Sequence, residues 1–176
     1  GKLNYGSTGN GASTHLSAAQ FASAAKVDIV HVPYRGQGPA MTALLAGDVD
    51  LFFNQSAPAI ASIKGGLNIG LAVTTPAALE ALPSVPPMAQ ACNLPGFESS
   101  TWYGLLAPAK LPAAIATKMS GAVAQVISTP EFKKWLTETQ GITPAQDPSP
   151  AAFAKIHKAD IAKWAEIVRI SGAQVD

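Results

Sequence analysis

The amino-acid sequence predicts an α/β fold with a parallel sheet, followed by a helical region. Through the first hundred residues, short apolar segments typical of strands alternate with segments of helical periodicity. Strands separated by helices of about 10–15 residues favour right-handed βαβ units, in which neighbouring strands are parallel. After residue 112 no strand pattern interrupts the helical one. Hydrophobic residues make up 48% of the 176 residues and charged residues 13%, which indicates a packed chain.

The expected elements are short and are bounded by glycine or proline. The predicted strands, rich in β-branched and aromatic residues, are residues 3–5, 28–32, 49–53, 69–73 and 101–107. The predicted helices are residues 14–25, 39–46, 57–64, 112–128, 130–140 and 150–170. Gly47 stands where a helix commonly ends, and four prolines make residues 82–97 a turn-rich connection. We place a boundary at residues 101–106, where the alternation of strands and helices ends.

Charge and cysteine content exclude several classes of function. The formal net charge is +1 and no run of Lys or Arg occurs, so we expect neither nucleic-acid binding nor a membrane-surface patch. Every apolar run is broken well before the roughly 18 residues that a membrane-spanning helix requires. Cys92 is the only cysteine, and the histidines at 15, 31 and 157 lack metal-ligand spacing. We therefore expect no disulfide within the chain, no metal and no cofactor.

The segment between the first predicted strand and helix has the composition of an anion-binding loop. Three glycines between residues 6 and 11 allow positive φ and a close approach of the backbone to a ligand. The following helix offers free N–H groups and the positive end of its dipole, and the loop lies at the carboxyl end of a strand. The candidate ligand-binding residues here are Ser7, Thr8, Gly9, Asn10, Gly11, Ala12 and Ser13. The alternative is a turn that only caps the helix.

Two further clusters follow the second and third predicted strands. Tyr34, Arg35 and Gly36 follow the second strand, and Arg35 either neutralises a carboxylate or forms a surface ion pair. The third strand ends in Asn54-Gln55-Ser56, from which we take Asn54 as a ligand-binding candidate because an amide reads a polar ligand without adding charge. The carboxyl ends of parallel strands share one edge of a sheet, so these clusters are expected beside the glycine loop.

Enzymatic alternatives are less consistent with the sequence. The glycines at 6, 9 and 11, with Arg35 after the next strand, suggest a dinucleotide site, but the spacing is not G-x-G-x-x-G. No G-x-S-x-G motif of a serine hydrolase occurs. His15 lies in the first turn of a predicted helix, where capping or packing is expected rather than catalysis. Because no set of nucleophile, base and orienting group emerges, we expect a binding protein and not an enzyme.

Seven stretches in consecutive order carry a family resemblance. They are residues 1–11 with His15-Leu16, 32–40, 44–50, 71–74, 82–86, 95–98 and 102–108. Together they resemble the solute receptors of tripartite tricarboxylate transporters, also called Bug receptors, over most of residues 1–108. The helical tail resembles the family more loosely. Two departures, Pro87 and the pair Cys92-Asn93, lie in the proline-rich connection and are expected to have little effect on function.

The resemblance implies a type II periplasmic-binding-protein fold, in which two α/β lobes close on a carboxylate. It assigns residues 1–103 to a second lobe that lacks its opening strand and helix. Residues 104–176 would supply a hinge strand and carboxy-terminal helices of the first lobe. Ser7, Thr8, Gly9 and residues 11–13 match the family's carboxylate loop, which binds through backbone amides and ordered waters. The rest of the first lobe and the signal peptide of the family would be absent from this chain, so we expect uncovered apolar faces and possible self-association.

The same resemblance implies a function in transport. The expected function is a periplasmic receptor that captures a small carboxylate, such as a dicarboxylate, a tricarboxylate, an aromatic acid or an amino acid. Its expected partner is the membrane permease of the transporter. The alternatives are a cytoplasmic effector-binding sensor of the same fold and the nucleotide-dependent enzyme considered above.

Overall fold

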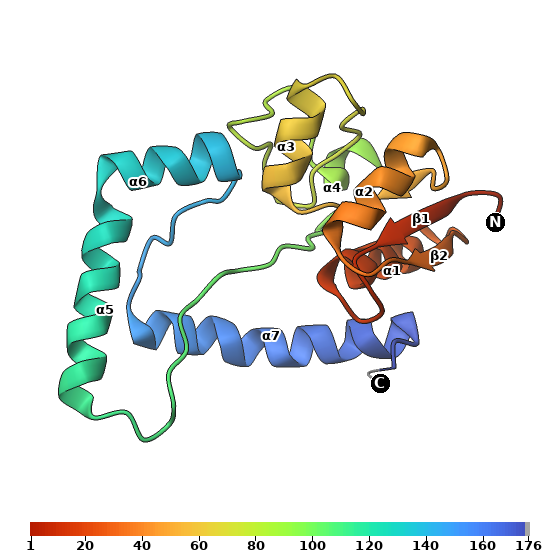
Figure 1. Ribbon diagram of the computed structural model, residues 1–176. Coiled ribbons are helices and arrows are strands. Elements are labelled where there is room, and N and C mark those ends of the chain that lie inside the picture. Colours follow the sequence, from red (N-terminus) through yellow and green to blue (C-terminus); the bar gives the residue numbers. More distant parts are fainter. Residues whose placement is uncertain (175–176) are drawn as a thin grey trace.

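The computed structural model describes residues 1–174 and contains a small parallel sheet flanked by helices and joined to an arc of longer helices (Figure 1). The strands are β1 (Asn4–Ser7), β2 (Val30–Pro33) and β3 (Leu51–Phe52). The sheet has the order β2-β1-β3, and β1 pairs in parallel with both neighbours. Tyr5 lies opposite His31 on one side and opposite Leu51 on the other. The predicted parallel α/β fold is thus confirmed.

Helices cover both faces of this sheet. The helix α1 (Ser13–Ala25) joins β1 to β2, and α2 (Gln37–Ala46) joins β2 to β3. Because β2 and β3 lie on opposite sides of β1, two right-handed crossovers place α1 and α2 on opposite faces, as Figure 1 shows. Both helices end in the left-handed conformation, at Lys26 and at Gly47, where φ is 79° and glycine is favoured.

A hydrophobic core lies under α3 (Ser56–Lys64). Ile60 packs with Ala81, Leu82 and Val85, and these four residues are each less than 10% exposed. The proline-rich connection therefore wraps around α3 before the short helix α4 (Met88–Ala91). An isolated parallel bridge joins Pro87 of this connection to Val73. Met88 N–H donates to Val73 O there at 2.7 Å.

Two predicted strands are wrong. Residues 69–73 form only the isolated bridge between Val73 and Pro87, and residues 101–107 have neither strand structure nor burial. Ile69 is 84% exposed and Leu106 is 75% exposed. A strand is stable only beside a partner that accepts its hydrogen bonds and covers one face, and neither segment has such a partner in residues 1–174. A strand-like composition alone is therefore not sufficient to predict a strand.

The remaining part of the described chain is helical, as expected. It contains α5 (Ala113–Ser128), α6 (Pro130–Lys134), the π-helix η1 (Trp135–Gln140) and α7 (Pro150–Ser171). The N-terminus of α7 is capped by Ser149, whose hydroxyl accepts from Ala152 N–H at 3.2 Å. At its other end α7 packs against α1 and buries Ile167 (Figure 1). The division into lobes at residue 103 stays a prediction.

The apolar faces of the helical region are only partly covered. Phe153 packs edge-on against Trp102, with ring centroids 4.8 Å apart, and both Phe153 and Trp164 are half-buried. Ile156 and Ile161 are 48% and 62% exposed. No helix in residues 1–174 combines the length and the hydropathy needed to span a bilayer.

We expect Ile60→Ala to lower the free energy of unfolding by about 2–5 kcal/mol, because the side chain is 4% exposed and its removal leaves a cavity. The matched control is Ile69→Ala, which should change stability by less than about 0.5 kcal/mol because Ile69 is exposed. Urea unfolding followed by circular dichroism measures both. Equal losses in the two variants would contradict the packing of α3.

Candidate functional site

The loop of residues 8–12 follows β1 and is held by hydrogen bonds from its own neighbours. Thr8 N–H donates to Thr14 Oγ1 at 2.9 Å, and the two threonine hydroxyls lie 3.0 Å apart. Gly9 N–H donates to Ser7 Oγ at 3.2 Å. Gly9 and Gly11 have φ of 141° and 73°, in the region that favours glycine. The composition that predicted an anion loop thus also supplies the bonds that shape it.

The internal bonds decide which amides remain for a ligand. The N–H groups of Thr8, Gly9, Gly11 and Ala12 all have acceptors at the end of β1, within the loop or in the first turn of α1. The N–H groups of Asn10, Ser13 and Thr14 have no acceptor among the hydrogen bonds of residues 1–174. Free N–H groups at a helix N-terminus bind anions. The free donors therefore lie mostly in the first turn of α1, and they include Thr14, whose hydroxyl the sequence already indicates as a donor.

The segment after β2 is joined to this loop by its backbone. Tyr34 N–H donates to Ser7 O at 3.0 Å, and Gly36 N–H donates to Thr8 O at 3.2 Å. The predicted residues Tyr34 and Gly36 thus lie beside the loop, but these bonds occupy their amides. Arg35 is exposed, and no ion pair of its guanidinium is found in the described residues. The surface ion pair considered for Arg35 is therefore not observed.

Amide side chains connect the start of α1 to the segment after β3. Gln55 Nε2 donates to Ser13 Oγ at 3.0 Å, and Tyr103 OH donates to Gln55 Oε1 at 3.1 Å. The predicted Asn54 accepts from Gln37 Nε2 at 2.5 Å, while Gln37 Oε1 is buried without a partner in the described chain. Gln55 was recognised as polar but not chosen, although it is the side chain that contacts Ser13.

Three aromatic rings stack beneath the loop. The centroids of His15 and His31 are 3.8 Å apart with an interplanar angle of 6°, and Tyr5 stacks on His31 at 5.0 Å. Gly11 N–H donates to His15 Nδ1 at 3.1 Å, and Ser7 Oγ lies 2.6 Å from His31 Nε2. His15 thus has the packing role that its position predicted.

Burial controls the protonation of these rings. Desolvation lowers the pKa of His15, and desolvation with the charge of His15 lowers the pKa of His31 to about 4. Desolvation also raises the pKa of Tyr5 to about 12. All three rings are therefore uncharged near neutral pH. Within residues 1–174 no three His, Cys, Asp or Glu side chains gather as metal ligands.

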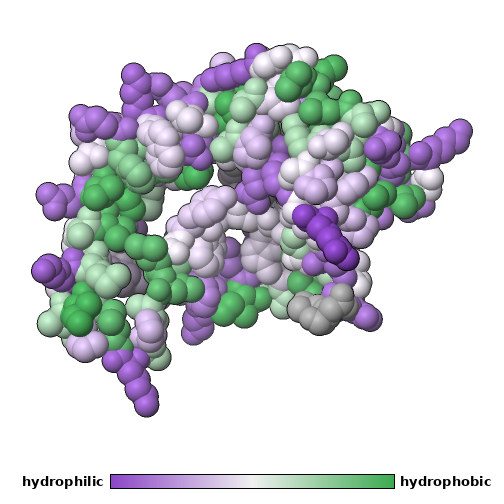
Figure 2. Space-filling view, viewed as in Figure 1, coloured by the Kyte–Doolittle hydropathy of each residue, from purple (hydrophilic) through white to green (hydrophobic). Residues whose placement is uncertain are grey.

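A cavity of about 1960 Å³ opens between the sheet unit and the arc of helices, and Figure 2 shows a deep hollow there. Ser13, Thr14, Asn54 and Gln55 line its polar part, and apolar side chains of α5, η1 and residues 67–73 line the rest. A ligand pocket usually has about 300–1,000 Å³. Ser13 and Thr14 thus face a space that is larger than one small ligand requires, whereas residues 7–12 and 34–36 are not among its lining residues.

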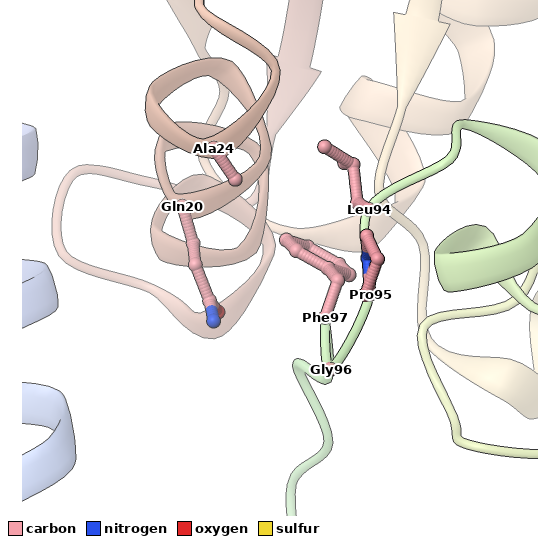
Figure 3. A pocket seen from close by; sticks show the side chains of 6 residues that line it. All are labelled: Gln20, Ala24, Leu94, Pro95, Gly96 and Phe97. Carbon is pink, nitrogen blue, oxygen red and sulfur yellow. The ribbon is translucent and has the colours of Figure 1, made fainter.

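A second, shallow pocket of about 350 Å³ lies between α1 and residues 94–97 (Figure 3). Among the residues that line this pocket, Gln20 has the polar side chain. Its Nε2 already donates to Glu98 O at 3.1 Å. Because no cationic side chain or helix N-terminus faces it among the lining residues, this pocket does not suit a carboxylate.

A comparison with known families agrees with this geometry. Residues 1–172 match the family described as the tripartite tricarboxylate transporter family receptor, TctC. The chain belongs to this receptor family. A UPF0065 protein from the tcbD–tcbE intergenic region of Pseudomonas sp. (strain P51) is 34% identical over 96% of the chain, and the chain spans 49% of that protein. A UPF0065 protein from the clcB–clcD intergenic region of Pseudomonas knackmussii is also 34% identical, and the chain spans 94% of it.

Solved structures show the same fold. An R. palustris protein solved with adipate has a TM-score of 0.87 and 28% identity over 98% of this chain, which spans 56% of that protein. MatC from Rhodopseudomonas palustris, with bound malate, has a TM-score of 0.82 and 29% identity over 94% of the chain and 56% of MatC. The family and these relatives are solute-binding proteins and not enzymes, which agrees with the prediction from the sequence.

We expect Thr14→Val to lower the free energy of unfolding by about 1–3 kcal/mol, because it leaves Thr8 N–H without its acceptor while side-chain volume is kept. Thr14 is 2% exposed, so water replaces the lost hydroxyl poorly. The matched control, Thr42→Val, removes an exposed hydroxyl from α2 and should change stability by less than about 0.5 kcal/mol. Urea unfolding tests both, and an unchanged Thr14→Val would refute the role of this hydroxyl.

Proposed function

We propose that this chain forms part of a periplasmic receptor that captures a small carboxylate at the N-terminus of α1. The observation that carries the proposal is the pair of N–H groups at Ser13 and Thr14, which have no acceptor among the described hydrogen bonds and line the large cavity. The adipate and malate bound by its structural relatives support a carboxylate as the ligand. The expected delivery of that ligand to a membrane permease rests on the family.

One carboxylate group accounts for the donors at this site. Its oxygens accept from Ser13 N–H and Thr14 N–H, while the positive end of the α1 dipole attracts its charge. Asn10 N–H provides another donor beside them. Arg35, Gly36 and Tyr34 form the neighbouring rim, where Arg35 adds a positive charge for a second carboxylate group of the same ligand. Asn54 and Gln55 read polar substituents without adding charge.

We also propose that residues 1–103 belong to one lobe of the receptor and residues 104–176 to the other. The sheet unit supports this division, since its own helices cover both faces of the sheet. Residues that follow β1 and β3, at the carboxyl edge of the sheet, line the cavity. The long helices line the opposite wall of that cavity. The ligand would then be enclosed between the two walls, with the donors of α1 at one of them.

We expect replacement of Gly11 by Val to weaken carboxylate binding at least tenfold, because φ at Gly11 is 73° and a β-branched residue moves the loop. The matched control is Gly66→Val, since Gly66 has a φ of 68°, equally open space around its Cβ position and a place outside the loop. Both variants should lose similar stability. Calorimetric titration with adipate and malate measures the binding, and equal affinities in the two variants would contradict the proposal.

We expect the isolated chain to self-associate, because several large apolar side chains remain in solvent. Tyr103, Leu105 and Leu106 are each more than 70% exposed, and a patch of this kind is typical of an interface. Light scattering at rising protein concentration should show a growing mean mass. The Leu105→Ser, Leu106→Ser double variant should reduce this growth. A wild-type monomer at all concentrations would refute the expectation.

A further inference from the structure

The stacked histidines connect the interior of the sheet unit to the candidate loop. His15 belongs to α1 and makes a hydrogen bond to Gly11 in the loop, and His31 belongs to β2 and makes one to Ser7 at the end of β1. His15 Nδ1 accepts from Gly11 N–H, and His31 Nε2 lies against Ser7 Oγ, which in turn accepts from Gly9 N–H. The positions of both glycines therefore depend on the two rings.

The bond from Gly11 fixes the protonation state of His15. A nitrogen that accepts a hydrogen bond carries a lone pair, so the proton of the neutral ring lies on Nε2. A second proton on Nδ1 would face Gly11 N–H, and the bond would be lost. The two parallel rings are also 3.8 Å apart, so charging either ring makes charging the other unfavourable, and a doubly charged stack would separate.

We propose that His15 and His31 are positioning residues, which hold the loop of residues 8–12 in its binding geometry only while both imidazoles are uncharged. Acidification then releases Gly11 and disorders the donors at the start of α1. The proposal deepens the proposed carboxylate site and rests on it for the effect on a ligand. The effect on the loop itself requires no ligand. The charge of His15 helps to lower the pKa of His31 to about 4, so His15 takes up its proton first and the change begins above that pH.

Within residues 1–174 no acidic side chain raises the pKa of either ring. Tyr5 of β1 stacks on both, and burial keeps its phenol protonated. The helix α7, which packs against α1, carries Asp160, Lys163, Glu166 and Arg169 towards its carboxyl end, and Glu166 pairs with Arg169 at 2.6 Å. α2 has no charged residue, and Arg35 follows β2. No hydrogen bond or ion pair joins any charged side chain to either imidazole within residues 1–174.

Nuclear magnetic resonance of the labelled chain between pH 8 and pH 3.5 tests the proposal without a ligand. At pH 7.5 the nitrogen shifts of His15 should report a proton on Nε2 alone. The amide signals of residues 9–13 should shift with the same midpoint as the ring of His15, below 6.5 and above the midpoint of His31. His157 is exposed, and replacing it by Asn is the control, which should leave the pH response of the loop amides unchanged. Loop amides that ignore the titration of both buried rings would overturn the proposal.

Two variants separate positioning from simple packing. His15→Asn keeps an acceptor for Gly11 N–H, whereas His15→Leu keeps volume but removes the acceptor. Hydrogen exchange of the Gly11 amide should be at least tenfold faster in His15→Leu and within about threefold of wild type in His15→Asn. Equal exchange in both variants would overturn the role of the acceptor. If His15→Leu does not fold, the pH dependence of His15→Asn decides, since its loop should no longer respond to titration at position 15.

Adipate and malate then probe the connection to binding. The ratio of wild-type to His15→Asn affinity should fall at least fivefold between pH 7.5 and pH 3.5, and using a ratio cancels protonation of the ligand itself. A constant ratio would contradict the link between the rings and the site. If neither protein binds either acid at any pH, the proposed function fails, while the loop measurements still decide the positioning role.

Discussion

The central place of β1 is the constraint on which the candidate site depends. Because β1 pairs in parallel with β2 and β3, the carboxyl ends of all three strands meet at one edge. The segments that follow them therefore lie together, and backbone bonds from Tyr34 and Gly36 to Ser7 and Thr8 fix their relative position. Antiparallel pairing of either neighbour would carry its polar segment to the opposite edge. The loop, Arg35 and Asn54 would then share no site.

Much of this arrangement follows from the sequence because it depends on local patterns. The strand at β1, the helices α1 and α2 and the glycine loop each have a signal within about ten residues, in periodicity or in backbone freedom. Residues 69–73 and 101–107 differ, because their strand composition has an effect only beside a partner strand. Thr14 and Gln55 were recognised as polar residues of the loop and of the third strand's end, but their contacts escaped prediction. Thr14 and Gln55 act through hydrogen bonds whose existence depends on the orientation of α1 over the sheet.

The buried rings illustrate a requirement that composition does not reveal. A glycine loop has many conformations, so composition alone does not define a binding geometry. Side chains from two different elements remove that freedom here, since His15 accepts from Gly11 and Ser7 connects Gly9 to His31. The rings themselves are neutral and stacked, so they supply an acceptor without placing a charge under a site for anions. A carboxylate in their place would accept the same bond but would repel the ligand.

Energetics indicate that the donors of α1 cannot bind a ligand tightly by themselves. A charge-assisted hydrogen bond contributes about 1.5–3 kcal/mol, and the helix dipole adds about 0.3–1 kcal/mol. Association costs at least about 4 kcal/mol in lost freedom, and micromolar affinity requires a net of about 8 kcal/mol. The two free amides at Ser13 and Thr14 therefore need further contacts and the exclusion of water. A cavity of about 1960 Å³ excludes water only when another wall closes over the ligand, so in the proposed receptor α1 would define where the carboxylate binds and closure would determine how tightly.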